Sequence, residues 1–249
     1  MKLIFLTTND PLYLPDFFER VLSEEAGRVA AVYAAPPLYK NESAVAAALK
    51  YLRTFGLADT ARLSARILRS KLQGRSIASV CRSRGIPYRE VADVNAPSFL
   101  RELEQQGPDA LVSVSCPQIF KERLIALPPR GILNIHGAIL PQYRGVMPSF
   151  WMMANGEKQA GVSIYFVNRR IDAGDLCARK IFDIDPRETL DHFLRRSKAI
   201  AADLLLRVIR LMECGEVSRL PLNLAEGSYY SWPDAEAVRR FRALGRRLW

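Results

Sequence analysis

The first 35 residues place the strongest constraint on the fold. Lys2 to Thr8 is an unbroken apolar run, as expected for a central strand of a parallel sheet that is buried on both faces. Leu14 to Glu25 follows with apolar residues at helical spacing, and Val29 to Ala35 is a second apolar run. A strand, a helix and a strand in this order open a doubly wound α/β fold. We therefore expect a mainly parallel central sheet with helices on its faces.

Length and composition set the expected organisation of the chain. The 249 residues, 49% hydrophobic and 25% charged, are enough for one large core and a small appendage. We expect a main domain over residues 1–215 and a short C-terminal extension over residues 216–249. No run resembles a signal peptide or reaches the roughly 20 apolar residues that span a bilayer. The expected location is the cytoplasm, without membrane contact.

The charge of the chain favours anionic partners. A formal net charge of +10 attracts phosphates and carboxylates over several ångströms. The basic residues are spread along the chain in clusters that suit solvated helix faces, so nucleic acid is not expected as a partner. The turn from Thr7 to Pro11 contains no glycine, and a phosphate-cradling nucleotide fingerprint is therefore absent.

Ser43 to Gln73 is a helical insert longer than a crossover requires. Its alanines, leucines and arginines predict two helices broken near Gly56. Ile86 to Glu90 predicts an edge strand. Thr189 to Cys214 predicts a long amphipathic helix that ends at a glycine, and we expect its His192 to be a packing or surface residue.

A short apolar strand carries the most informative polar residues. Arg130 to His136 brings Asn134 and His136, two residues apart and so on the same side, to the carboxyl end of a strand. Open α/β sheets bind ligands at that end. Asp172 lies in a later turn formed with Ala and Gly, and we expect the three side chains to converge. Two histidines and four scattered cysteines do not form a metal-ligand pattern, so no metal site is expected.

The motifs around these residues resemble a known family. They are Asn134-Ile135-His136, Leu140-Pro141-Gln142-Tyr143-Arg144-Gly145, Gly156-Glu157, Gly161-Val162-Ser163-Ile164 and Asp172-Ala173-Gly174-Asp175. They are similar to those of the formyltransferases that use formyltetrahydrofolate, and the similarity is clearest from Val112 to Asp185. The resemblance implies a Rossmann-like formyltransferase fold, with Asn134, His136 and Asp172 as catalytic residues. It also implies 10-formyltetrahydrofolate as the donor, released as tetrahydrofolate.

The resemblance further implies where the folate binds. The residues expected around it are Pro87, Tyr88, Arg89, Ser115, Cys116, Pro117, Gln118, Ile119, Val167, Asn168 and Ile171. Cys116 could be read as a nucleophile. Because no base neighbours it in the sequence, we expect a small apolar lining role for its side chain.

The chemistry of formyl transfer suits these residue types. Attack of an amine on a formyl group forms a tetrahedral oxyanion, which the Asn134 amide and a protonated His136 can stabilise. Asp172 can take up and relay protons through water. Each residue taken alone has an ordinary structural explanation, since Asn caps turns, a lone His is often a satisfied polar residue and Asp-Ala-Gly-Asp is a common turn. Their joint occurrence favours catalysis.

We expect an N-formyltransferase whose acceptor is a small, anionic primary amine, with a nucleotide-linked amino sugar favoured. Methionyl-tRNA, an amino acid or a natural-product intermediate stay open as acceptors. The tail after Glu216 is too short for the second domain of the tRNA enzymes, which argues against tRNA. A formyltetrahydrofolate hydrolase and a non-catalytic folate- or nucleotide-binding module are the rival classes. The aromatic tail is compatible with a homodimer.

Overall fold

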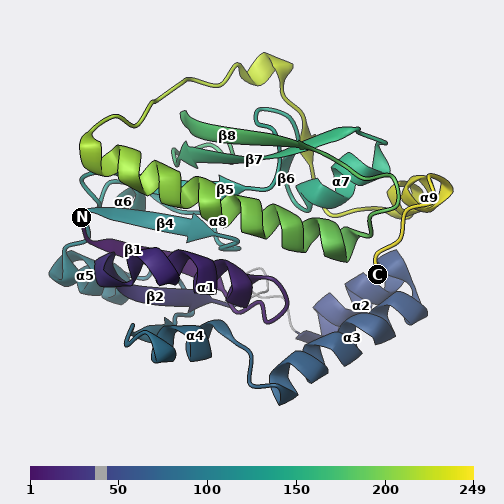
Figure 1. Ribbon diagram of the computed structural model, residues 1–249, viewed down its shortest axis with the longest axis horizontal. Coiled ribbons are helices and arrows are strands. Elements are labelled where there is room, and N and C mark those ends of the chain that lie inside the picture. Colours follow the sequence, from purple (N-terminus) through teal and green to yellow (C-terminus); the bar gives the residue numbers. More distant parts are fainter. Residues whose placement is uncertain (37–43) are drawn as a thin grey trace.

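A seven-stranded sheet forms the centre of the protein (Figure 1). The computed structural model describes residues 1–36 and 44–249 and orders the strands β3-β2-β1-β4-β5-β7-β8. The neighbours from β3 to β5 pair in parallel, whereas β7 runs antiparallel to β5 and to β8. The predicted α/β class with a mainly parallel sheet is confirmed. The strands are β1 (Leu3–Thr8), β2 (Val29–Ala35), β3 (Tyr88–Glu90), β4 (Ala110–Val114), β5 (Ile132–His136), β7 (Gln159–Phe166) and β8 (Leu176–Asp183).

Helices cover both faces of the sheet. Alternate residues of β1 enter different cores: Phe5 packs in the cluster that includes α1 and α8, and Leu6 in the cluster that includes α5. This two-sided burial explains why β1 is apolar throughout. The covering helices are α1 (Leu14–Glu25), α4 (Ile77–Ser83) and α8 (Leu190–Cys214) on one face, and α5 (Pro97–Gln106) and α6 (Glu122–Ile125) on the other.

Helix α8 runs the length of the sheet (Figure 1). Its start is capped by the Thr189 side chain, which accepts a hydrogen bond from the His192 backbone N–H, and it ends at Gly215 in the left-handed conformation. Both ends agree with the prediction from the sequence. The His192 side chain is exposed and pairs with Glu188, Nδ1 to Oε1 at 2.8 Å.

The helical insert forms a hairpin of α2 (Ala44–Phe55) and α3 (Leu57–Leu72), broken at Gly56 as predicted. Gly56 has a φ of 91°, which side chains rarely adopt. Ser43, where the insert was expected to begin, lies outside the described residues. The hairpin lies away from the sheet and beside α9 (Ala235–Ala243), as Figure 1 shows.

The C-terminal segment packs on the central motif of the sequence. Its strand β9 (Tyr229–Tyr230) pairs in parallel with β6 (Arg144–Gly145). The ring of Phe241 in α9 stacks at 5.0 Å on Phe150 of α7 (Pro148–Ala154). Two short 3-10 turns complete the elements, Ala26–Arg28 and Leu224–Glu226. In the part of the chain that the structure describes, no helix combines the length and apolar content needed to span a bilayer.

Candidate active site

A cavity of about 590 Å³ opens at the carboxyl ends of the parallel strands. Residues following β1, β4 and β5 line it, together with the loop after β7 and residues of α7 and α8. A volume of this size suits a small-molecule site. In open α/β sheets such sites form at the carboxyl ends of the strands, at the point where the strand order reverses direction.

Asn134, Tyr165 and Asp172 form a hydrogen-bonded chain at one end of the cavity. The Asn134 amide donates to the Tyr165 hydroxyl at 2.9 Å, and that hydroxyl donates to Oδ1 of Asp172 at 2.8 Å. Asn134 and Tyr165 stand opposite each other in the antiparallel pairing of β5 with β7. Burial, and then the charge of Asp172, raise the pKa of Tyr165 well above its usual range, so the hydroxyl remains a donor.

His136 lies against the same carboxylate. Its Nε2 is 2.7 Å from the carbonyl oxygen of Tyr143, and because a carbonyl can only accept, Nε2 carries a hydrogen. Its Nδ1 faces Oδ2 of Asp172 at 3.6 Å. The imidazole is 6% exposed. Nδ1 is therefore the nitrogen at which a proton can come and go.

The loop that carries Asp172 is held by backbone groups. Oδ2 of Asp172 accepts a hydrogen bond of 2.8 Å from the N–H of Gly145, and Asp172 itself has a φ of 48°. A Cβ on Gly174 would overlap the carbonyl oxygen of Phe166, so only glycine fits there. A Cβ on Gly145 would meet the carbonyl of Tyr230 in the same way. The packing around the Asp172 loop therefore requires glycine at both positions, Gly145 and Gly174.

The structure brings the three residues predicted as catalytic together around one carboxylate. The arrangement offers two nitrogen donors beside an anionic oxygen, which suits a reaction that develops charge on an oxygen and moves a proton. Tyr165, which links Asn134 to Asp172, was missed by sequence reasoning. Its place opposite Asn134 depends on the register of β7 with β5, which is a tertiary property.

Eight of the residues expected around the folate line this cavity: Ser115, Cys116, Pro117, Gln118, Ile119, Val167, Asn168 and Ile171. Pro87, Tyr88 and Arg89 do not. They lie at β3, on the edge of the sheet, and β2 and β1 separate that strand from β4. We therefore leave these three residues out of the candidate site.

Cys116 has the properties of a lining residue. Burial raises the pKa of its thiol to about 11, so the reactive thiolate is scarce at neutral pH. The nearest histidine along the strands, His136, is engaged with Tyr143 and Asp172. Nucleophilic catalysis by this thiol has no structural support.

The lining of the cavity includes further polar residues that sequence reasoning did not single out. Nζ of Lys198, on α8, donates a hydrogen bond of 2.8 Å to Oγ of Ser115, which has a φ of 54°. Burial lowers the pKa of Lys198, and the charge of Asp10 opposes that shift. Asp10 folds back on its own loop, where Oδ1 accepts from the N–H of Leu12 at 2.8 Å and of Tyr13 at 3.3 Å. The Lys198 side chain therefore lines the cavity together with Asp10 and Tyr13 of the loop after β1.

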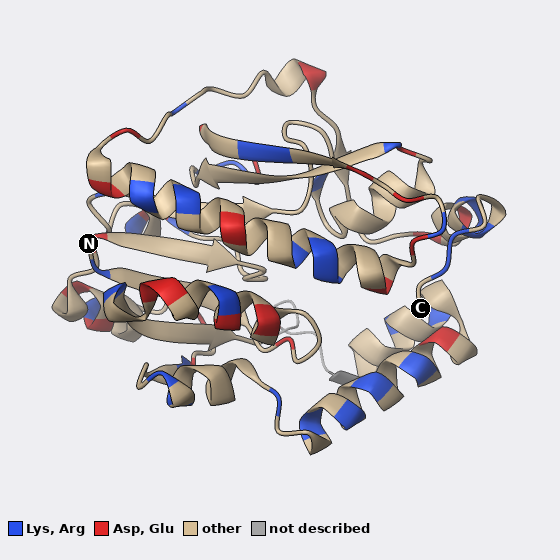
Figure 2. Ribbon diagram, in the orientation of Figure 1, with Lys and Arg blue, Asp and Glu red and all other residues tan. Residues whose placement is uncertain are grey.

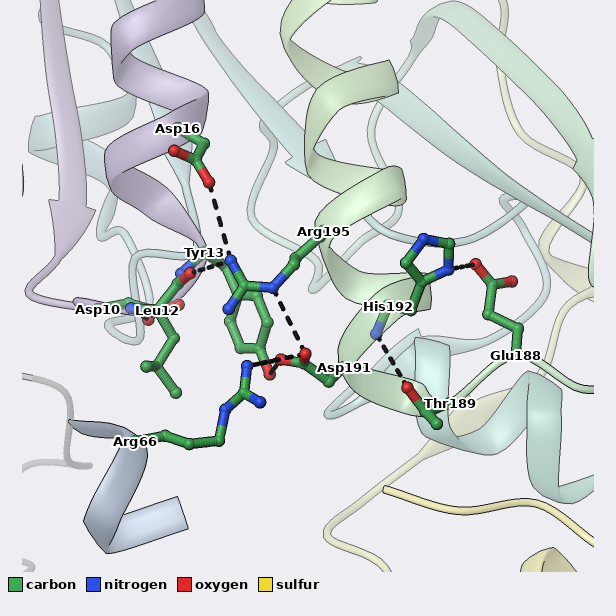
Figure 3. Close-up of polar contacts among 10 residues, drawn as sticks. All are labelled: Asp10, Leu12, Tyr13, Asp16, Arg66, Glu188, Thr189, Asp191, His192 and Arg195. Carbon is green, nitrogen blue, oxygen red and sulfur yellow. Dashed lines mark hydrogen bonds and ion pairs between the residues drawn. The ribbon is translucent and has the colours of Figure 1, made fainter. Parts of the chain in front are cut away.

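Tyr13, also a lining residue, is fixed from outside the cavity (Figure 3). Its hydroxyl donates to Oδ1 of Asp191 at 3.0 Å. Asp191 also accepts from Arg66 of α3, with Nη2 2.8 Å from each oxygen. Arg195 lies over the Tyr13 ring, 5.4 Å from its centroid. The helical insert thus supports one wall of the cavity.

Among residues 1–36 and 44–249, no group of three or more His, Cys, Asp or Glu side chains is arranged to hold an ion. The arrangement of Asn134, His136 and Asp172 is that of a hydrogen-bonding and proton-transfer site.

Comparison with known proteins adds a family to this geometry. Residues 1–209 match the model of the Formyl transferase family. A methionyl-tRNA formyltransferase from Syntrophus aciditrophicus is 34% identical over 144 residues, which are 58% of this chain and 46% of that protein. The chain thus spans less than half of that relative.

Two solved structures share the fold. An N-formyltransferase from Helicobacter canadensis, in complex with folinic acid and dTDP-3-aminofucose, has a TM-score of 0.61 and 16% identity over 98% of this chain and 80% of its own. The glycinamide ribonucleotide transformylase 1 of Symbiobacterium toebii has a TM-score of 0.62 and 17% identity over 88% of this chain and 94% of its own.

Proposed function

The chain belongs to the formyl transferase family, and from this premise we propose that it moves a formyl group from 10-formyltetrahydrofolate to the primary amine of a small acceptor. One observation carries the proposal: Asn134, His136 and Asp172 meet in a cavity whose lining also includes Lys198. The eight lining residues that would receive the folate are Ser115, Cys116, Pro117, Gln118, Ile119, Val167, Asn168 and Ile171.

The first step is attack of the neutral amine on the formyl carbon. A new bond forms between the acceptor nitrogen and that carbon, and the carbonyl oxygen becomes an oxyanion. The Asn134 amide is the donor that would stabilise it, and the positive charge of a protonated His136 would add to that stabilisation. Loss of one oxyanion donor lowers the rate of comparable enzymes by ~10²–10³-fold.

The second step breaks the bond between the formyl carbon and the folate nitrogen. The acceptor nitrogen loses one proton and the folate nitrogen gains one, so the products are a formamide and tetrahydrofolate. Asp172 would take up the proton from the acceptor nitrogen and return it through water to the folate nitrogen as that bond breaks, while Tyr165 holds its Oδ1. The hydrogen bond from Gly145 keeps Oδ2 pointed at the imidazole.

For the acceptor we favour an amino sugar carried on a nucleotide diphosphate. Lys198 places a cation in the cavity beside Asp10 and Tyr13, and the chain carries a net charge of +10. Both features favour an anionic molecule. The Helicobacter canadensis enzyme of the same fold is complexed with a compound of this class.

Methionyl-tRNA is the second candidate acceptor, because the relatives with 31–34% identity are named methionyl-tRNA formyltransferases. A hydrolase that releases formate from the same donor would use the same residues, and a binding module would use the cavity without turnover.

One assay separates these candidates. The protein is incubated with 10-formyltetrahydrofolate alone, then with a panel of nucleotide-linked amino sugars, free amino acids and methionyl-tRNA, while tetrahydrofolate and formate are measured. We expect tetrahydrofolate only with an amino sugar, together with a formylated sugar. Formate without an amine would identify a hydrolase, and no turnover with any compound would leave only the binding module.

A further inference from the structure

Helix α3 turns its apolar side towards solvent. Its Leu57, Leu68 and Leu72 are 76%, 59% and 79% exposed. Ala61 and Ala65 are exposed as well. These positions are separated by three, four or seven residues and therefore form one stripe along the helix.

Helix α2 also exposes apolar side chains. Its Val45 and Leu49, one turn apart, are 68% and 45% exposed. Of the eleven large apolar side chains that are exposed among the described residues, five lie on these two helices. We call Val45, Leu49, Leu57, Leu68 and Leu72 the apolar face of the hairpin. An exposed apolar surface of this kind marks an interaction site.

Polar contacts fix the opposite side of α3 to the protein. Ser70 is buried and its hydroxyl donates to the carbonyl of Pro11 at 2.8 Å. Asp59 forms an ion pair with Arg242 at 3.1 Å, and Arg66 reaches Asp191 at 2.8 Å. Leu63 and Ile67 lie on this side and are half-buried. The helix is thus held by its inner side, and the stripe with Leu57, Leu68 and Leu72 is left available for a partner.

Basic residues flank the apolar stripe. Residues 44–75 include seven Lys or Arg and one acidic residue, in a chain whose net charge is +10. Figure 2 shows basic positions repeating along α3. By helical spacing, Arg62 and Arg69 lie along one side of the leucine stripe and Lys71 along the other, and all three are exposed.

We propose that the α2–α3 hairpin lies flat on an anionic phospholipid surface. The apolar face would enter the boundary between headgroups and acyl chains, and Arg62, Arg69 and Lys71 would contact the lipid phosphates. Leucines on one side and Arg or Lys at its margins are the pattern of helices that lie in a membrane interface. A helix of this kind need not span the bilayer, so the absence of a spanning segment, on which the expectation of no membrane contact rested, does not oppose it.

The basic residues beside the apolar face favour an anionic membrane over a second copy of the chain or a nucleic acid. Two copies of the chain joined through this hairpin would bring their basic margins together, which is repulsive. Nucleic acid would satisfy the arginines but leave the leucines in water. An anionic lipid surface satisfies both groups at once.

Docking would also orient the cavity. Arg66 and Ser70 tie α3 to Asp191 and to the Pro11–Tyr13 loop, and Tyr13 lines the cavity. The hairpin is therefore fixed to the wall of the site, and the Tyr13 end of the cavity would lie towards the bilayer.

The test is co-sedimentation of the full chain with vesicles, without folate or acceptor, so its outcome is independent of formyl transfer. We expect binding to vesicles of phosphatidylcholine mixed with phosphatidylglycerol and weak binding to phosphatidylcholine alone. Leu68→Ser and Leu72→Ser should each weaken partitioning about tenfold. Arg62→Gln and Arg69→Gln should each weaken it about fivefold, because each basic residue near such a surface contributes about 1 kcal/mol.

Matched control variants are Leu220→Ser, an exposed leucine of the C-terminal segment, and Arg101→Gln, an exposed arginine of α5. Neither should change partitioning. Thermal unfolding of all variants checks that they are folded, as expected for exposed positions.

Three results would overturn the proposal. One is a lack of binding to both kinds of vesicle. Another is vesicle binding that the Leu68 and Leu72 variants leave intact. The third is a wild-type dimer in the absence of lipid that Leu68→Ser dissociates, which would assign the apolar face to a second copy of the chain.

Discussion

Nδ1 of His136 lies 3.6 Å from Oδ2 of Asp172, while Nε2 of the same ring is held by the carbonyl of Tyr143 at 2.7 Å. The carbonyl fixes one proton on the imidazole, and the carboxylate faces the nitrogen where a second proton can bind. The two residues come from β5 and from the loop after β7, and only the antiparallel pairing of these strands brings them together.

Replacing His136 should remove most of the activity. His136→Asn keeps a polar side chain but cannot carry the mobile proton, and we expect turnover to fall by ~10²–10³-fold. His192→Asn is the matched control, because that histidine is 71% exposed and pairs only with Glu188 among the groups described around it. Tetrahydrofolate release in steady state measures both. Full activity of His136→Asn would exclude the proposed mechanism.

Tyr165→Phe tests the link between Asn134 and Asp172. Removing the hydroxyl leaves Oδ1 of Asp172 without its 2.8 Å donor, so we expect the free energy of unfolding to drop by about 1–3 kcal/mol and turnover to drop by about tenfold. The matched control is Tyr88→Phe, since the buried Tyr88 hydroxyl has no hydrogen-bond partner among residues 1–36 and 44–249 and its removal should not destabilise the fold. Chemical denaturation measures both variants. Equal losses for the two would contradict a specific role of Tyr165.

Gly174→Ala should disrupt the loop that carries Asp172. The added methyl group would overlap the carbonyl of Phe166, so the loop has to move, and we expect turnover to fall by at least about tenfold. Gly27→Ala is the control, because a Cβ there meets nothing within 4 Å. If Gly174→Ala had the activity of the unmodified chain, the position of Asp172 would not matter as we propose.

Cys116→Ala should retain activity within about threefold. Burial raises the pKa of this thiol to about 11, so it stays protonated at neutral pH and cannot act as a nucleophile. For the same reason, iodoacetamide at pH 8 should modify the exposed Cys214 well before Cys116, which peptide mass spectrometry can follow. Loss of activity in Cys116→Ala with unchanged folate binding would restore the covalent alternative.

Lys198→Met tests how the buried charge of Lys198 affects the stability of the protein. Burial lowers the pKa of Lys198 from 10.5, so between the lowered value and 10.5 the unfolded chain binds more protons than the folded one. Stability should therefore rise with pH across that window. In Lys198→Met this rise should disappear, and the free energy of unfolding at neutral pH should increase.

The same variant tests acceptor binding. If Lys198 meets an anionic acceptor, Lys198→Met should raise the KM for that acceptor by at least about tenfold and leave the KM for the folate unchanged. A variant that is less stable at neutral pH, or one that raises only the KM for the folate, would contradict our account of Lys198.

Much of the fold follows from local patterns. Apolar runs such as Leu3–Thr8 and Val29–Ala35 match the observed strands, and the break of the insert at Gly56 and the end of α8 at Gly215 occur where glycine indicated them. These features depend on neighbours within a few residues, which a sequence displays directly.

The candidate site was only partly predictable. Asn134 and His136 share one strand, so their common side follows from alternation. Tyr165, Lys198 and Tyr229 were not singled out, because they reach the cavity through strand register, helix placement and the pairing of β9 with β6. The expectation that Pro87 to Arg89 lie at the same site did not match the geometry, since strand order decides which loops are neighbours.

By itself, the sequence determined the alternation of strands and helices, the family and the three polar residues of the site, because periodicity and short motifs are local. The tertiary structure decided which nitrogen of His136 faces Asp172, what holds that carboxylate and that Lys198 of α8 lines the cavity. It also decided that α3 exposes Leu57, Leu68 and Leu72, since a helix has the same amphipathic pattern whichever side it turns to its neighbours. Contacts between distant segments depend on the packing of the whole chain, and no local pattern contains them.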